Sequence, residues 1–212
     1  MEDLLLIGGG GHCKGVLDTI TSSDNFNVVG IIDIKEKVGS YVDEIKVIGT
    51  DDDLEKIFEN GIKNAFITIG NVNVSSVRRN IFMKLKKIGF KFPQIIDSSA
   101  VISTNCIIGE GTYVGKRVVV NSHAIIGVNC IINSGSIIEH DCIIGDFTHI
   151  APGAVLSGGV NVGNNSLLGT NSTVIQGINI GENTLIGAGS VVIKNINDNC
   201  IAYGNPCKEI KR

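Results

Sequence analysis

The sequence predicts an α/β domain followed by a parallel β-helix, two folds with different periodicities in one chain of 212 residues. The second half carries an aliphatic residue at every sixth position from 102 to 192 without a break. The first half instead alternates short apolar runs with helical stretches of higher charge density. A period of six fits neither a 3.6-residue helix nor a two-residue strand alternation, so it belongs to a coil that changes direction every few residues.

Residues 1–97 are predicted to form a small parallel, Rossmann-like sheet. The expected strands cover residues 4–7, 28–33, 65–69 and 94–96, and the expected helices cover residues 12–22, 51–60 and 74–88. Strands that alternate with helices are typical of a parallel sheet. The segment from 33 to 50 receives no assignment.

Four consecutive glycines at residues 8–11 connect the first expected strand to the first expected helix. Such a turn lets backbone N–H groups approach a phosphate at the positive end of a helix. The dinucleotide fingerprint fails, because Cys13 stands where its third glycine is required. A nucleotide-sugar diphosphate uses the same electrostatics without the full motif. The alternative that stays open is that the glycines only make a tight turn.

Asp33 closes the second strand 22 residues after Gly11 and is placed to accept hydrogen bonds from a ribose or a uracil. Ligands of open α/β sheets bind outside the carboxyl ends of the strands, where the third expected strand also ends. The alternative is that Asp33 merely ends a strand. The predicted substrate-binding residues are Gly10, Gly11, His12, Asp33, Ile34, Gly70 and Asn71.

Residues 98–212 are predicted to form the β-helix and a short carboxyl-terminal segment. Four positions after each aliphatic residue the side chain is nearly always small, with Val118, Val160 and Ile178 as the larger exceptions. We expect these two positions to point inward and three six-residue units to close each coil. The glycine that often follows the aliphatic residue suits a corner where a Cβ atom would clash. The aliphatic positions are Ile102, Ile108, Val114, Val120, Ile126, Ile132, Ile138, Ile144, Ile150, Leu156, Val162, Leu168, Val174, Ile180, Ile186 and Val192.

Composition excludes several classes of protein. A net charge of −3 argues against a nucleic-acid partner. No apolar run is long enough for a membrane span, and the acidic start does not look like a secretory signal. Three of the six cysteines fall in the small inward position of the repeat, and the others lack metal-ligand spacing. We expect a reduced cytoplasmic protein without disulfides or a metal site.

Three of the four histidines, His123, His140 and His149, fall at outward positions of the repeat. His140 stands between Glu139 and Asp141, and a neighbouring carboxylate can stabilise an imidazolium. An imidazole titrates near neutral pH and therefore suits general-base catalysis. From spacing alone, a solvated surface histidine and a catalytic histidine both stay open.

The segment Ile138–Ala154 resembles the signature of the hexapeptide-repeat sugar acyltransferases, which include sialic acid O-acetyltransferases and bacillosamine-pathway UDP-amino-sugar N-acetyltransferases. The Gly-Gly-His turn at residues 10–12, Asp33, the segment 69–71 and the closing Gly204-Asn205-Pro206 match in the same order. The resemblance implies that the β-helix is left-handed. It also implies a homotrimer with sites between subunits. The spacing of His140 and His149 agrees, because nine residues are half of an 18-residue coil and place the two histidines on different parts of the triangle.

In that family the histidine followed by an acidic residue is the catalytic base, which gives this role to His140 and makes Asp141 its supporting carboxylate. The bacillosamine enzymes have Glu where this chain has Asp141, so the carboxylate here has a shorter reach. The resemblance places acetyl-CoA on His149, Gly158, Thr170 and Ala188. For Gly158 an ordinary coil corner is the alternative.

The implied reaction is transfer of an acetyl group from acetyl-CoA to a sugar, with N-acetylation of a nucleotide-linked amino sugar as the favoured case. O-acetylation of sialic acid or of a related surface polysaccharide sugar is the alternative within the family. A trimeric scaffold that binds sugar nucleotides without catalysis is the alternative outside it. Because a histidine base would serve an amine or a hydroxyl, the sequence does not identify the acceptor.

Overall fold

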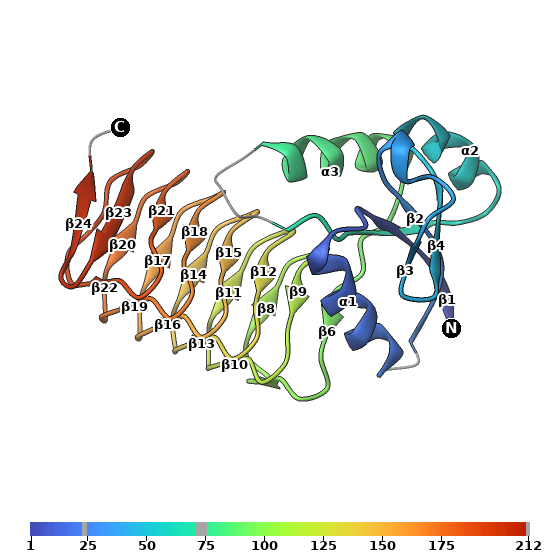
Figure 1. The fold of residues 1–212 in the computed structure, drawn as a ribbon. Helices are drawn as coiled ribbons and strands as arrows, with labels where there is room; N and C mark the ends of the chain where they lie inside the picture. The colour runs from blue at the N-terminus through green and yellow to red at the C-terminus, as the bar shows by residue number, and fades with distance from the viewer. Residues whose placement is uncertain (23–24, 71–75, 211–212) are drawn as a thin grey trace. The chain divides into compact units, whose positions relative to one another are not determined.

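A computed structural model describes residues 1–22, 25–70 and 76–210 (Figure 1). The chain divides into two compact units, the first made of residues 1–70 and 76–95 and the second beginning at Ile96. The boundary predicted after residue 97 lies close to this division. The first unit is an α/β domain, and the second is a long stack of very short strands.

The first unit contains one sheet with the strand order β3-β4-β2-β1-β5. All neighbours in it are parallel except β3 and β4, which are antiparallel. Strand β1 lies between β2 and β5, and its residues 4–7 are buried. The strands are β1 (Glu2–Ile7), β2 (Phe26–Ile32), β3 (Tyr41–Val42), β4 (Ile45–Gly49) and β5 (Asn64–Ile67). The helices are α1 (Gly11–Thr21), α2 (Leu54–Glu59) and α3 (Val77–Ile88), with 3-10 turns η1 (Lys35–Lys37) and η2 (Asp51–Asp53).

The unassigned segment from 33 to 50 contains η1, β3 and β4. Its strands are at the edge of the sheet and are half exposed, so they lack the continuous apolar run of a buried strand. The third expected strand, β5, ends at Ile67 instead of residue 69. Helix α3 begins at Val77, and the predicted start at Val74 lies outside the described residues.

The second unit is a parallel β-helix whose strands form three faces. Face 1 holds β7 (Val101–Ile102), β10 (Val119–Val120), β13 (Ile137–Ile138), β16 (Val155–Leu156), β19 (Thr173–Val174) and β22 (Val191–Val192). Face 2 holds β8 (Ile107–Ile108), β11 (Ile125–Ile126), β14 (Ile143–Ile144), β17 (Asn161–Val162) and β20 (Asn179–Ile180). Face 3 holds β6 (Ile95–Ile96), β9 (Tyr113–Val114), β12 (Ile131–Ile132), β15 (His149–Ile150), β18 (Leu167–Leu168), β21 (Leu185–Ile186), β23 (Ile201–Gly204) and β24 (Cys207–Ile210).

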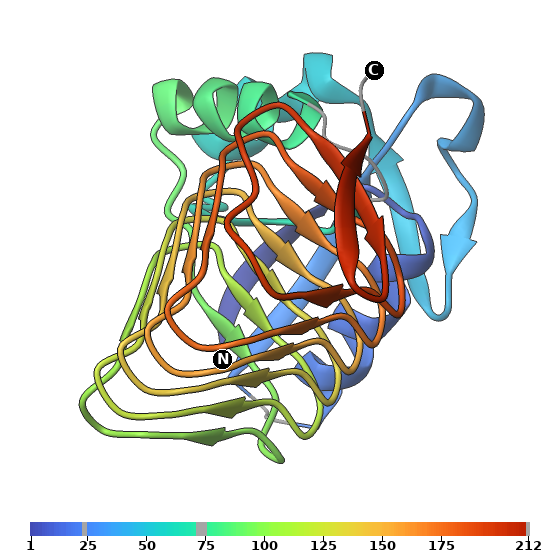
Figure 2. The same cartoon turned by 90° about the vertical axis from the view of Figure 1, so that its left-hand side faces the viewer.

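The two inward positions of the repeat make the core of this unit. The aliphatic residues from Val114 to Val192 are all buried, and Ile102 and Ile108 are partly buried at the first coil. The positions four further on are buried from Thr112 to Ser190. Figure 2 shows the coils stacked along their common axis, so that each side chain packs on its equivalents in the coils before and after it.

Each corner has a residue in the left-handed backbone region, three positions after the aliphatic one. Glycine, asparagine and aspartate dominate there, as expected for a positive φ. The set from residue 111 to residue 189 is Gly111, Arg117, His123, Asn129, Gly135, Asp141, Phe147, Gly153, Gly159, Asn165, Asn171, Gly177, Asn183 and Gly189. The glycine that directly follows the aliphatic residue is required for a different reason, the close approach of the next coil. A Cβ atom on Gly145 would lie 2.7 Å from the backbone nitrogen of Asn164 in that coil.

The stack ends in the antiparallel pair β23 and β24, joined through a cis peptide bond between Asn205 and Pro206. Gly204 N–H donates a hydrogen bond to the Ser190 hydroxyl and attaches this pair to the last coil. Among the residues that the structure describes, no helix has both the length and the apolar character needed to cross a membrane.

Candidate functional site

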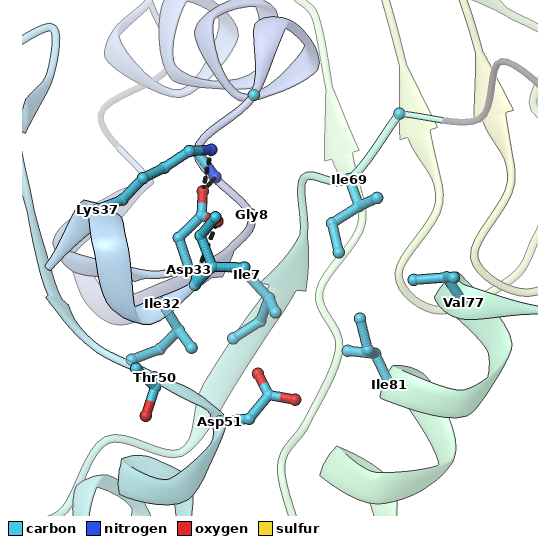
Figure 3. A pocket seen from close by; sticks show the side chains of 14 residues that line it. Ile7, Gly8, Ile32, Asp33, Lys37, Thr50, Asp51, Ile69, Val77 and Ile81 are labelled. Atoms are coloured by element: carbon cyan, nitrogen blue, oxygen red, sulfur yellow. Dashed lines mark hydrogen bonds and ion pairs between the residues drawn. The ribbon is translucent and has the colours of Figure 1, made fainter.

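The first unit has a pocket of about 550 Å³ at the carboxyl ends of its strands (Figure 3). Its walls are the end of β1, the glycine turn, the end of β2 with η1, Thr50 and Asp51, and the first turns of α3. Aliphatic side chains line much of the pocket, among them Ile7 and Ile32 from the strands and Ile81 from α3. This is the sheet edge at which ligands of α/β proteins bind.

Asp33 connects the glycine turn to the loop after β2. Its Oδ2 atom accepts hydrogen bonds from Gly9 N–H at 2.7 Å and from the Lys37 ammonium at 2.9 Å. Its Oδ1 atom accepts a hydrogen bond from Ile34 N–H at 2.7 Å. Burial alone would raise the pKa of this carboxyl group, but hydrogen bonds from Lys37, Ile34 and Gly9 together hold it below its ordinary value. Asp33 is therefore a charged carboxylate with three donors already bound.

The structure brings only some of the predicted substrate residues to the pocket. Gly10, Asp33, Ile34 and Gly70 line it, whereas Gly11 and His12 do not. His12 lies beside Gly70 instead, since a Cβ atom on that glycine would be 3.5 Å from the His12 Cβ atom. Asn71 lies outside the described residues.

The predicted substrate-binding residues did not include five polar or glycine residues of the pocket, which are Gly8, Gly9, Lys37, Thr50 and Asp51. Lys37 follows Asp33 by four residues, and one turn of η1 brings its ammonium to the carboxylate. That spacing was visible in the sequence. It was not informative without a predicted helical turn at residues 35–37.

In the second unit His140 lies in the turn between β13 and β14. We call the column of turns between face 1 and face 2, which contains residues 121–124, 139–142 and 157–160, the His140 corner. His140 and Asp141 are both exposed there, and the Nδ1 atom of His140 lies 2.8 Å from the Oδ2 atom of Asp141. Asp141 has a φ of 58°. Its carboxylate reaches the His140 ring although aspartate is one methylene shorter than glutamate. A neutral imidazole that donates from Nδ1 to this carboxylate leaves Nε2 as a proton acceptor.

Gly158 lies one coil above His140 and provides room for its ring. A Cβ atom on Gly158 would lie 2.5 Å from Cε1 and 2.6 Å from Nε2 of the imidazole. The backbone at this position does not require glycine, because its φ is outside the left-handed region and the equivalent residue of the next coil is Gln176. The structure thus brings Gly158 to the histidine.

The other predicted acetyl-CoA residues lie elsewhere on the coil. His149 is in β15 on face 3, where its Nε2 atom is 3.2 Å from the Asn133 amide nitrogen. Thr170 and Ala188 are exposed in successive turns between face 3 and face 1, and Gly189 N–H donates to the Thr170 carbonyl oxygen. In a three-sided coil the His140 corner is opposite face 3. One chain therefore presents His140 and His149 on different sides of its β-helix.

The six cysteines are free, and Cys130 and Cys142 point into the core of the β-helix. Burial raises the pKa of the Cys142 thiol, which disfavours the nucleophilic thiolate. No group of three or more His, Cys, Asp and Glu side chains within residues 1–22, 25–70 and 76–210 is arranged to hold a metal ion.

Two family models match the chain in its two units. The PglD N-terminal domain matches residues 3–85, and the bacterial transferase hexapeptide, in six repeats, matches residues 123–158. PerB from Caulobacter crescentus, solved with CoA and GDP-perosamine, is 33% identical over 100% of this chain and 98% of that one, with a TM-score of 0.92.

The chain belongs to the hexapeptide-repeat sugar acyltransferases. A second similar structure is the acetyltransferase domain of PglB from Neisseria gonorrhoeae, which is 31% identical over 99% of this chain and 100% of that one, with a TM-score of 0.91. The predicted fold is confirmed, including the left-handed β-helix that is typical of the hexapeptide repeat. The predicted enzyme class is confirmed as well, and the non-catalytic scaffold is not supported.

Proposed function

We propose that this acyltransferase moves the acetyl group of acetyl-CoA to the amino group of a nucleotide-linked amino sugar, with His140 as the general base. The observation that carries the proposal is the contact between Nδ1 of the exposed His140 and Asp141 Oδ2 at 2.8 Å, which leaves Nε2 of the neutral ring as the proton acceptor. Support for the substrates comes from PerB, which is described with CoA and GDP-perosamine, and from the PglB domain, which is described with acetyl-CoA.

In the proposed reaction Nε2 of His140 accepts the proton of the amine as its nitrogen attacks the thioester carbonyl. The C–S bond then breaks, and the imidazolium returns the proton to the sulfur, so that CoA leaves as the thiol. Asp141 holds the ring by its other nitrogen and stabilises the imidazolium formed during the transfer. A backbone N–H of the β-helix stabilises the oxyanion. Direct transfer is favoured, because the repeat cysteines face the core.

We propose that the pocket of the first unit holds the nucleotide part of the acceptor. Gly10, Ile34 and Gly70 line it, and Asp33 keeps one acceptor position on Oδ1 after its three protein hydrogen bonds. Gly11 and His12 begin α1 beyond the pocket wall and act through the turn that they shape. Asp33→Ala is expected to raise the Michaelis constant for the sugar nucleotide more than that for acetyl-CoA.

The test is a thiol-release assay with acetyl-CoA and a panel of UDP- and GDP-linked amino sugars, with free sialic acid as the hydroxyl acceptor. His140→Ala is expected to lower kcat by roughly 100- to 10,000-fold, the usual contribution of a positioned base. His123→Ala is the matched control, because His123 is an exposed histidine one coil away at the same corner. Near-normal turnover by His140→Ala would remove the histidine from the mechanism.

Binding is expected to survive the loss of the base. Structures of the Caulobacter enzyme with one histidine replaced by asparagine or by alanine also contain CoA and GDP-perosamine. We therefore expect His140→Asn to bind both substrates and to fail in transfer. A variant that lost binding and turnover together would indicate a structural role.

We further propose a homotrimer in which each active site combines the His140 corner of one copy with His149, Thr170 and Ala188 of another. The support is topological, because these residues lie on different sides of one β-helix. Exposed Ile125 and Ile143 on face 2, beside the His140 corner, are apolar side chains that a second copy would cover. Symmetric closure of a ring repeats this interface three times.

Mixed trimers test the shared site. His140→Ala and Ala188→Trp chains are each expected to form inactive homotrimers. If copies assort at random from an equimolar mixture, each trimer that contains both kinds of chain has one site of its three built from two intact halves, so about one quarter of all sites recover activity. Mixed trimers without activity, or an active monomer in sedimentation, would overturn this arrangement.

A further inference from the structure

The charge balance of the pocket in the first unit is unusual for a site that would receive a diphosphate. Two carboxylates, Asp33 and Asp51, line it. Among the lining residues that the structure describes, Lys37 carries the only positive charge. A doubly charged anion beside Asp33 would be repelled unless a cation lay between them. Lys37 is the residue placed to do this.

The position of Lys37 is set by the loop and by Asp33. Turn η1 brings its ammonium to the Asp33 Oδ2 atom at 2.9 Å, the same oxygen that accepts Gly9 N–H. The ammonium is therefore held at the glycine turn, as Figure 3 shows. The Lys37 side chain is 44% exposed, whereas that of Asp33 is 10% exposed. Of the three donors on an ammonium, one is directed to Asp33, so two can meet a ligand.

The space beside the glycine turn is open. Gly10 and Gly11 have no atom within 4 Å of where a Cβ would stand, and helix α1 begins there. Asp33, by contrast, is almost saturated by protein donors. It is therefore better placed to hold the cation than to be the main contact of a ligand.

We propose that Lys37 recognises the diphosphate of the nucleotide sugar and that Asp33 is the positioning residue that holds Lys37 at the glycine turn. The proposal rests on the proposed function, because it names the group that reads the anionic part of the acceptor. In it the ammonium bridges the Asp33 carboxylate and a phosphate oxygen. The isoleucine side chains of the pocket contact the base, and Lys37 contributes the part of the affinity that depends on phosphate.

A purely structural role makes a different prediction. If the Lys37–Asp33 pair only stabilised the loop after β2, its removal would weaken the binding of a nucleoside and of its diphosphate to the same extent. If Lys37 binds phosphate, the decrease in affinity is smallest for the nucleoside, larger for the monophosphate and largest for the diphosphate. The comparison of the three ligands therefore separates the two roles without a measurement of turnover.

The experiment is isothermal titration of the full-length protein with UDP, UMP and uridine and with GDP, GMP and guanosine. Lys37→Met removes the charge and keeps the length of the side chain. Lys84→Met is the matched control, because Lys84 is 45% exposed and lies 3.7 Å from Asp51, the other carboxylate of the pocket. Lys37→Arg keeps the positive charge and tests for rescue.

We expect Lys37→Met to lower the affinity for the preferred nucleoside diphosphate by roughly 10- to 100-fold, which is the effect of losing a hydrogen bond to a charged group. The affinity for the nucleoside is expected to change by less than about twofold. Lys37→Arg is expected to restore most of the diphosphate affinity, and Lys84→Met to change neither ligand. Equal weakening of diphosphate and nucleoside by Lys37→Met overturns the proposal and leaves the proposed function intact. Failure of the wild-type protein to bind UDP or GDP overturns both.

Discussion

Gly158 offers a sharp test of how the β-helix positions its histidine. In Gly158→Ala the new Cβ atom would stand 2.5 Å from Cε1 and 2.6 Å from Nε2 of His140. Carbon atoms reach their optimal contact near 3.5 Å, so the ring must retreat by roughly 1 Å. A displacement of about 1 Å at a reacting group can reduce turnover by about 100-fold, which corresponds to about 2.7 kcal/mol in the activation free energy.

The same methyl group is expected to have little effect on the stability of the fold. The clash is with the exposed end of a side chain, and Gln176 occupies the equivalent position one coil later. Replacing glycine by alanine also lowers the entropy of the unfolded chain, which favours the folded state. We therefore expect an unchanged or slightly higher melting temperature together with a kcat reduced by about 100-fold.

A double-mutant cycle with His140→Ala identifies the cause of the loss, since contacting residues are not additive. In the thiol-release assay Gly158→Ala should reduce kcat strongly in the wild-type background and hardly at all in the His140→Ala background. Binding of acetyl-CoA, measured by titration, shows whether the methyl group also obstructs the donor. Turnover of Gly158→Ala within about twofold of wild type would refute the inference that this glycine provides the space in which the His140 ring is positioned.

Three further predictions concern the support of the site and of the fold. Asp141→Asn should lower kcat by about 10- to 100-fold, less than loss of the base, with little change in the Michaelis constants, and wild-type kcat would contradict a role for this carboxylate. The pKa of Asp33 is lower in the folded state than its ordinary value, so its contribution to stability is present above about pH 4 and is lost as the pH falls through the folded-state pKa. Urea unfolding at pH 7 and pH 3 should therefore show a smaller acid loss for Asp33→Asn than for the wild-type protein, and identical losses would contradict it. Gly145→Ala places a Cβ atom 2.7 Å from a backbone nitrogen of the next coil, so it should destabilise the β-helix by about 1–3 kcal/mol, and an unchanged melting temperature would mean that the coils can separate at no cost.

Much of the second unit could be predicted because its repeat is local. An inward aliphatic residue every six positions indicates the coil, and the buried residues from Val114 to Val192 follow it. The outward placement of His140 followed from the same register, and the exposed side chain confirms it. The residue in the left-handed region at each corner was also present in the sequence as a column of Gly, Asn and Asp, although sequence reasoning attended to the glycine two positions earlier.

The first unit was less predictable at its edge. Strand β4 follows β3 closely and exposes the apolar Ile48, so its sequence lacks the apolar–polar alternation that identifies a strand. The pairing of Lys37 with Asp33 depends on the single turn η1. A prediction that Asp33 faces a ligand was reasonable from its place at a strand end, but its carboxylate is held mainly by Gly9, Ile34 and Lys37.

The sequence by itself determined the two folds, the register of the β-helix and the order of the motifs, because short-range periodicity and strand-to-helix turns are written in consecutive residues. Only the tertiary structure showed which atoms lie against the glycines of the β-helix. Gly158 seats the ring of His140 from the coil above, and Gly145 admits the backbone of the next coil. These relations join residues one coil apart, and they depend on how the coils stack, which no local pattern encodes.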